Sequence, residues 1–227
     1  MSPHVLSTAL KISLALMMGS AVVRGDDAAD AVAGQWLNSA AKVKTLTVQF
    51  AQERKLRTLN RALVRQGKLW YQRSGDFRWQ IDEPPSLIGI KTADSPLQWI
   101  DTKARTIRTT ATKADGSAAD PAMEIMQGLL SADTAKFAAQ FRILSAKTAE
   151  SPGAWDIELD PRDRRTSIAV KTIELRGTPE TGALHFSSVF MRDGSILTTR
   201  VLHAQTDQPI PPAAFTFDTS GFRTLNE

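Results

Sequence analysis

Residues 45–81 constrain the fold more than any other part of the chain. Apolar and polar residues alternate in three short segments here, whose apolar members are Leu46, Val48 and Phe50, then Leu69 and Tyr71 around Trp70, then Phe77, Trp79 and Ile81. Successive side chains of a strand point to opposite faces, so each segment has one apolar and one polar face. Three such strands in succession predict a curved antiparallel sheet whose apolar face must be covered.

The rest of the chain continues this pattern. Turn residues recur at intervals of roughly ten, which is typical of a meandering sheet or barrel. Further strands are predicted at residues 87–90, 97–100, 105–110, 141–144, 155–159, 168–175, 186–191, 196–204 and, last, 214–217. Before the first strand, Val32, Trp36 and Ala40 recur at helical spacing and predict a packing helix of about four turns. The predicted fold is therefore mainly β, within one domain at residues 26–227.

One helical stretch interrupts the strands. Asp120 and Pro121 suit the first positions of a helix at residues 121–130, which carries Met123, Ile125, Met126, Leu129 and Leu130. A second short helix follows at residues 131–139, with Ser131 as its predicted cap. Such an insertion can cover the mouth of a barrel, and methionine suits a surface that accepts varied apolar shapes. The alternative is that these methionines simply fill the core.

The N-terminus predicts export. Lys11 precedes a short apolar run at residues 12–23, and Gly25 ends a plausible cleavage site, so we expect a signal peptide at residues 1–25 and a periplasmic mature protein. The chain has no cysteine, so it has no disulfide, no thiolate metal site and no site for its own acylation.

The charge is modest in sum and uneven in distribution. The formal net charge is +4, too weak for a nucleic-acid partner. Residues 42–113 hold 15 basic and 6 acidic side chains, whereas residues 115–227 hold 11 basic and 15 acidic ones. The basic part is either a solvated sheet face or a docking face for acidic partners or anionic lipid headgroups.

Catalytic patterns are missing from the sequence. It has no glycine-rich phosphate loop, no HExxH and no nucleophile elbow. His185 and His203 occur in unrelated predicted strands, and Asp82 and Glu83 are adjacent strand residues that face opposite ways. We therefore expect a binding protein, with no catalytic residue, metal or cofactor.

Several short motifs resemble the LolA family of periplasmic outer-membrane lipoprotein carriers. They are Phe50 with Gln52, Gly67 with Leu69 and Trp70, Arg73 at a turn, Phe77 with Trp79, the segment GLLSAD at residues 128–133 and AAFTF at 213–217. The resemblance implies a half-open antiparallel β-barrel with an N-terminal helix, and lid helices that close an apolar cavity for acyl chains.

The resemblance also implies site residues. Arg73 matches an arginine that hydrogen-bonds the lid, although Ser74 replaces the family's proline; the alternative for Arg73 is a solvated turn. Phe77 and Trp79 match cavity-lining positions, and either could be plain core. The pattern alone adds Phe50, Trp70, Trp99, Met126 and Leu130 to the predicted acyl cavity and lid gate.

Three functions remain open at this point. The first is a monomeric carrier that takes acylated lipoproteins from an inner-membrane ABC exporter to an outer-membrane acceptor lipoprotein. The second is a binder of the same fold for another lipid, a glycolipid or a pigment. The third is a β-rich interaction module with a filled interior and no ligand.

Overall fold

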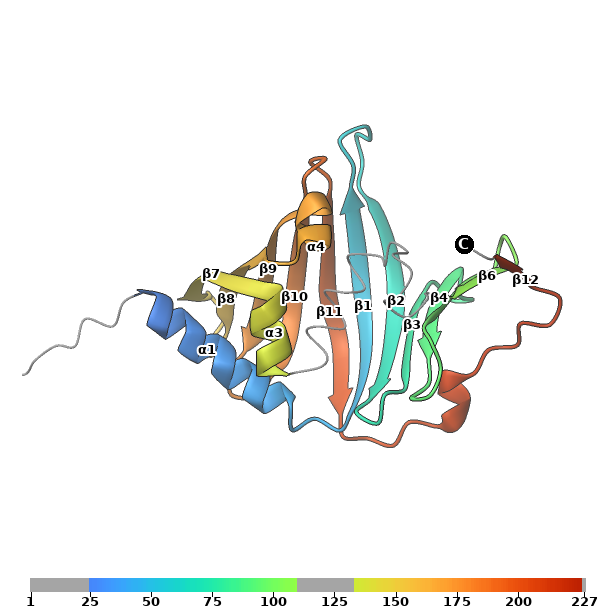
Figure 1. Ribbon diagram of the computed structural model, residues 1–227, viewed down its shortest axis with the longest axis horizontal. Coiled ribbons are helices and arrows are strands. Elements are labelled where there is room, and N and C mark those ends of the chain that lie inside the picture. The colour runs from blue at the N-terminus through green and yellow to red at the C-terminus, as the bar shows by residue number, and fades with distance from the viewer. Residues whose placement is uncertain (1–24, 110–132, 226–227) are drawn as a thin grey trace, which may run out of the picture.

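A single large sheet dominates the computed structural model, which describes residues 25–109 and 133–225 (Figure 1). The helices are α1 (Gly25–Ala40), α3 (Thr134–Gln140), α4 (Arg164–Ala169) and the 3-10 helix η1 (Pro212–Phe215). The strands are β1 (Thr45–Lys55), β2 (Leu63–Gln72), β3 (Phe77–Ile81), β4 (Leu87–Lys91), β5 (Gln98–Asp101), β6 (Thr106–Thr109), β7 (Phe141–Thr148), β8 (Trp155–Pro161), β9 (Val170–Thr178), β10 (Ala183–Met191), β11 (Ile196–Thr206) and β12 (Arg223–Leu225). Within the described residues, no helix is long and apolar enough to cross a membrane.

The strand order confirms the predicted mainly β, half-open architecture. It runs β12-β6-β5-β4-β3-β2-β1-β11-β10-β9-β8-β7, and every neighbouring pair is antiparallel except β12 with β6. β1 and β11 join the two halves of the sheet at its centre. The edge strands β7 and β12 do not pair with each other, so the sheet stays open.

The strand registers define two faces. Val48 pairs with Leu69, and Leu69 pairs with Trp79, so these side chains share what we call the inner face. The same face continues through Leu197, Val189, Ile173 and Leu159 on the other half. Alternation in the sequence thus places one apolar row on one side of the whole sheet.

Helix α1 covers the inner face of the half formed by β7–β10 (Figure 1). Ala29, Ala33, Trp36 and Leu37 are buried, at the three- and four-residue spacing of one helical stripe. The indole of Trp36 donates a hydrogen bond to the carbonyl of Ala183 at 3.3 Å. The predicted packing helix is confirmed, with Trp36 as its main contact.

The other face of β4–β6 has a core of its own. Ile88, Ile90 and Ile100 are buried there. Phe217 and Phe222 of the C-terminal segment, residues 212–222, pack against them. This segment runs along the edge of the sheet to β12 (Figure 1). A second apolar layer on the outer face explains why β4 is buried along most of its length.

Three predictions of local structure are wrong. Residues 214–217 form no strand, because the segment begins with prolines and turns through η1 so that Phe215 is buried. Ile168 lies in α4 instead of a strand, because the Asp163 carboxylate accepts a hydrogen bond from the Thr166 amide and starts a helical turn. Helix α3 is capped by Asp133, whose carboxylate accepts from two backbone amides, and not by Ser131.

The predicted signal peptide and the predicted helix at residues 121–130 lie outside the described residues, apart from Gly25. Both stay predictions, as does the single domain at residues 26–227.

Candidate functional site

An aromatic row crosses the inner face of β1–β5. Trp79 on β3 pairs with Gly89 on β4, which pairs with Trp99 on β5. Phe50 on β1 pairs with Gly67 on β2, which pairs with Ile81 on β3. Because cross-strand partners lie on one face, these strands bring three predicted site residues together: Phe50, Trp79 and Trp99.

The three rings are in contact. The Phe50 and Trp79 rings are stacked, with centroids 6.2 Å apart and planes at 15°, and Trp79 meets Trp99 edge to face at 5.8 Å and 82°. Phe50 and Phe77 are 3% and 5% exposed, and Trp79 is 9% exposed, whereas Trp99 is only partly buried. These geometries are the favoured ones for aromatic pairs. The row is therefore an ordered apolar surface, and Trp99 is its accessible end.

Two glycines make room for this row. A Cβ on Gly67 would lie 2.2 Å from Cζ of Phe50 and 2.5 Å from the carbonyl oxygen of Gln80. A Cβ on Gly89 would lie 3.0 Å from Cζ3 of Trp99. Each glycine thus provides the space in which a ring from a neighbouring strand lies. Sequence reasoning did not assign these glycines to the site, although a glycine inside a strand is itself a signal of close approach.

Trp70, also predicted as a cavity residue, does not lie on this surface. Its register partners, Thr47 and Arg78, place it on the outer face, because it is adjacent to Leu69, which points inward. The guanidinium of Arg78 lies 5.5 Å from the centre of the Trp70 ring.

Arg78 ties Trp70 to the C-terminal segment. Its guanidinium donates to the carbonyls of Ala214 and Thr216 at 3.2 and 2.9 Å, and to Oε1 of Gln80. Burial lowers the pKa of Arg78 from its ordinary value, and the charge of Glu83 opposes that shift. The arginine therefore fixes the segment that covers the outer face.

Arg73 bonds the end of α1. Its Nε donates to the carbonyl of Val43 at 2.8 Å and its Nη2 to the carbonyl of Ala40 at 2.9 Å. These carbonyls lie at and just after the C-terminus of the helix, where no intrahelical donor reaches them. Arg73 thus contacts the C-terminal end of α1, and the lid contact that the family resemblance implies stays a prediction. The residues of the predicted lid helix, with Met126 and Leu130, lie outside the described part of the chain.

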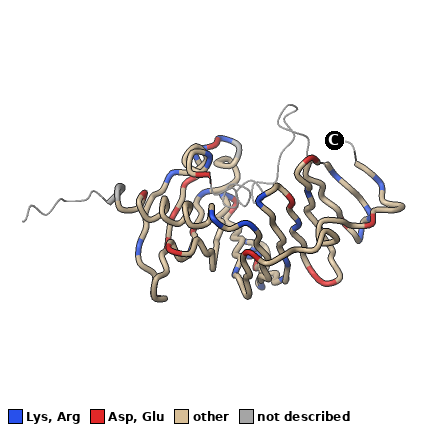
Figure 2. The backbone as a smooth tube through the Cα atoms, turned by 90° about the horizontal axis from the view of Figure 1, so that it is seen from below, with Lys and Arg blue, Asp and Glu red and all other residues tan. Residues whose placement is uncertain are grey.

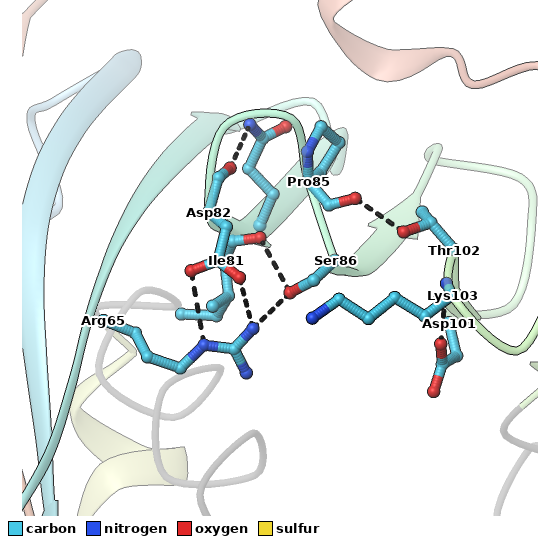
Figure 3. A network of polar contacts seen from close by, with 9 residues as sticks. Arg65, Ile81, Asp82, Pro85, Ser86, Asp101, Thr102 and Lys103 are labelled. Atoms are coloured by element: carbon cyan, nitrogen blue, oxygen red, sulfur yellow. Dashed lines mark hydrogen bonds and ion pairs between the residues drawn. The ribbon is translucent and has the colours of Figure 1, made fainter.

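A polar network lies where β2 meets the turn between β3 and β4 (Figure 3). Arg65 donates to both carboxylate oxygens of Asp82 and to the hydroxyl of Ser86, which in turn donates to the carbonyl of Ile81 at 3.3 Å. The hydrogen bond from Arg65 is the main cause that lowers the pKa of Asp82, followed by the bond from Ser86. This network holds the end of the aromatic strands in place.

Two of the cavities that described residues line lie away from the aromatic row. One of about 350 Å³ lies beside Arg57 and Asp193, and one of about 250 Å³ lies between β4, β5 and the C-terminal segment. Among the described residues, no cluster of three or more His, Asp or Glu side chains could hold a metal ion. Within the described residues, the aromatic row is a packed surface, and neither of these two cavities lies beside it.

Comparison with known families gives one match, which covers most of the chain. The family described as "Outer membrane lipoprotein carrier protein LolA" matches residues 41–218. This chain belongs to the LolA family. The LolA match includes every described strand except β12, and the family is one of carriers, not enzymes. A search of curated proteins found no match.

Several solved structures are similar to this chain at low sequence identity. An uncharacterized conserved protein from Thermus thermophilus has 8% identity and a TM-score of 0.53, over 87% of this chain and 98% of that one. A putative outer membrane lipoprotein-sorting protein domain from Vibrio parahaemolyticus has 10% identity and a TM-score of 0.47, over 82% and 95%. The Pseudomonas aeruginosa MucA/MucB complex has 11% identity and a TM-score of 0.49 over 84% of this chain, which spans only 61% of that chain. At these identities the likeness concerns the fold alone.

The geometry gives the LolA-like motifs a physical reason. Gly67 and Leu69 belong together because the glycine receives Phe50 and the leucine joins the same apolar face. Trp70 lies on the opposite face, so the short motif of Gly67, Leu69 and Trp70 places residues on both faces of the sheet.

Proposed function

We propose that this protein is a periplasmic carrier that binds the acyl chains of lipoproteins on the inner face of its sheet. The observation that carries the proposal is the aromatic row Phe50–Trp79–Trp99, on the open sheet of a LolA-family chain. The predicted helix at residues 121–130, with Met126 and Leu130, would serve as its movable cover, and Phe77 would line the same site.

The energetics favour a sheltered site of this kind. Each buried CH₂ contributes about 0.8 kcal/mol, so a sixteen-carbon chain left in water forfeits roughly 12 kcal/mol. A carrier must recover much of this free energy on loading and give it up on release. An apolar face that the protein itself covers when empty meets both needs, because loading exchanges one apolar contact for another.

The proposed route follows from the family and the predicted signal peptide at residues 1–25. Acylated lipoproteins would be received from an inner-membrane ABC exporter and delivered to an outer-membrane acceptor lipoprotein, with the carrier acting as a monomer. No covalent step is required, and the family assignment agrees with a binding protein.

Native mass spectrometry of protein purified from the periplasm tests the cargo. Co-purified diacylated or triacylated lipoprotein supports the carrier. A glycolipid or pigment would assign the same site to another cargo. Protein that is empty and also fails to bind a fluorescent fatty-acyl probe would contradict any ligand on this face.

Two tryptophan variants test the face directly. Trp99→Gln removes an accessible ring from the inner face, and the loss of about 1.5 kcal/mol of apolar contact should weaken binding of the acyl probe roughly tenfold. Trp70→Gln is the matched control, because this partly buried tryptophan lies on the outer face. Equal losses in the two variants would refute the assignment of the inner face.

A further inference from the structure

Three segments meet at one end of the sheet, and we call this end the rim: the β1–β2 hairpin at residues 53–65, helix α4 and the β10–β11 turn at residues 192–195 (Figure 1). Arg192 joins the last two, since its amide donates to the carbonyl of Ala169 at 2.8 Å and its Nε to that of Ser167 at 2.5 Å. The hairpin approaches the turn so closely that a Cβ on Gly194 would lie 2.6 Å from Cδ of Arg57. The rim is therefore one continuous surface.

Apolar side chains project from the rim into solvent. The described part of the chain has six large hydrophobic residues that are exposed, and four of them belong to the rim: Leu59 (43%), Leu63 (48%), Val64 (65%) and Ile168 (69%). The other two, Leu144 and Leu202, lie on β7 and β11. Exposed apolar groups gathered in this way mark an interaction surface, whereas single ones do not.

Exposed cations are interleaved with these apolar groups. Arg54, Lys55, Arg57 and Arg61 are exposed and form no ion pair with any described residue. Arg65 differs, because its guanidinium is held by Asp82 and Ser86 at the base of the hairpin (Figure 3).

Few acids face these cations. Glu53 lies on the same hairpin, and Asp193 lies in the adjoining turn, where it accepts from the hydroxyl and amide of Ser195 at 2.7 and 2.8 Å. Asp193 borders the groove of about 350 Å³ that Arg57 lines. Charge elsewhere is mixed, with Lys and Arg marked along both halves of the chain (Figure 2). The rim hairpin combines a cationic excess with exposed apolar groups.

We propose that the rim docks this protein on an anionic lipid surface, with Leu59, Leu63, Val64 and Ile168 entering the interface and Arg54, Lys55, Arg57 and Arg61 meeting lipid phosphates. A lipid–water interface offers both partners at one depth, acyl carbon below and negative headgroups at its surface. A projecting hairpin with separate apolar tips matches such a fluid surface. The proposal goes beyond the carrier function, and it stands on the rim whatever the inner face binds.

Flotation with lipid vesicles tests the charge requirement. The purified full-length mature chain, without cargo, should float with phosphatidylcholine vesicles containing one-quarter phosphatidylglycerol, should not float with pure phosphatidylcholine, and should be released by high salt. Each basic residue near an anionic surface contributes about fivefold, so Arg57→Glu combined with Arg61→Glu should weaken binding at least about 25-fold. Arg200→Glu, an exposed cation in the middle of β11, should bind as the parent does.

A dye on the hairpin tests insertion separately. The chain has no cysteine, so Leu59→Cys gives one site for an environment-sensitive dye, and Leu202→Cys gives the matched exposed site on β11. The Leu59 dye should brighten and shift to the blue with anionic vesicles, and the Leu202 dye should not. If the protein binds neither kind of vesicle, the proposal is wrong, and an acidic protein becomes the alternative partner for the rim. Equal binding to neutral vesicles, or unchanged binding of the double arginine variant, would overturn it as well.

Discussion

Replacing Gly67 by alanine should destabilise the fold through one well-defined clash. An ideal Cβ at this position would lie 2.2 and 2.5 Å from two ring carbons of Phe50 and 2.5 Å from the carbonyl oxygen of Gln80. Real Cβ atoms do not approach other heavy atoms below 3.0 Å, so either the ring or the backbone of β3 must move. Phe50 is 3% exposed and stacks on Trp79, so its ring has little room to yield.

The size of the effect follows from overpacking. Added methyl groups in packed cores cost about 1–3 kcal/mol, and a domain of this size loses about 2–4 °C in Tm per kcal/mol. Gly67→Ala should therefore lower the Tm by roughly 2–12 °C in a thermal melt followed by circular dichroism. Gly34→Ala is the matched control, since nothing beyond the nearby backbone of α1 itself lies within 4 Å of its Cβ position, and alanine favours a helix. That variant should be as stable as the parent or more so.

A double-mutant cycle identifies the atoms responsible. Two of the three contacts at the Gly67 Cβ position come from Phe50, so Gly67→Ala should cost at least about 1 kcal/mol less when Phe50 is already alanine. If the losses of stability in the two single variants simply add in the double variant, Gly67 does not provide the space for the Phe50 ring. An unchanged Tm of the Gly67→Ala protein would contradict the reasoning as well.

Two further variants test the hydrogen bonds that Asp82 and Arg78 form at the sheet. Arg65 and Ser86 lower the pKa of Asp82, so its charge stabilises the fold above the ordinary pKa and this contribution is lost as pH falls through the folded pKa. Asp82→Asn should thus be less stable than the parent at neutral pH, and the difference in unfolding free energy should shrink below a pH of about 4; a difference independent of pH would contradict this. Arg78→Met keeps the apolar stem but loses the bonds to Ala214 and Thr216, so amide exchange at residues 212–222 should quicken while exchange in β1 stays as it was. Unchanged exchange in that segment would show that Arg78 does not hold it.

The alternation of apolar and polar residues in the sequence predicts most of the fold. Strands such as β1, β3 and β8 follow directly from residues that alternate between apolar and polar. The turn between the predicted strands 186–191 and 196–204 is formed at Asp193-Gly194, with Gly194 at a φ of +83°. Together with the LolA-like motifs, this was enough to predict a half-open sheet with an N-terminal helix. Phe50, Trp79 and Trp99 lie on one face because period two fixes sidedness once the register is known, and their role in acyl binding stays a prediction.

Two of the differences from the sequence predictions have their physical origin in the second layer. Trp70 is aromatic and next to Leu69, and nothing local indicates that a distant segment would cover its face of the sheet. Residues 214–217 alternate like a strand, yet Phe215 and Phe217 serve that outer layer. Ile168 is β-branched and favours a strand, but the Asp163 cap outweighs that preference in a short helix. The structures of Trp70 and of residues 214–217 depend on contacts with distant parts of the chain, which local sequence patterns do not reveal.

The unpaired edges of the sheet have a mechanical consequence. In a closed barrel, strand number and stagger fix the radius, whereas β7 and β12 leave this sheet free to alter its curvature. A change of a few degrees in twist between neighbours breaks no ladder hydrogen bond, and over twelve strands it accumulates into a wider or narrower trough. The capacity of the proposed acyl-binding face would therefore be an elastic property of the sheet, adjustable to acyl chains of different bulk without local unfolding.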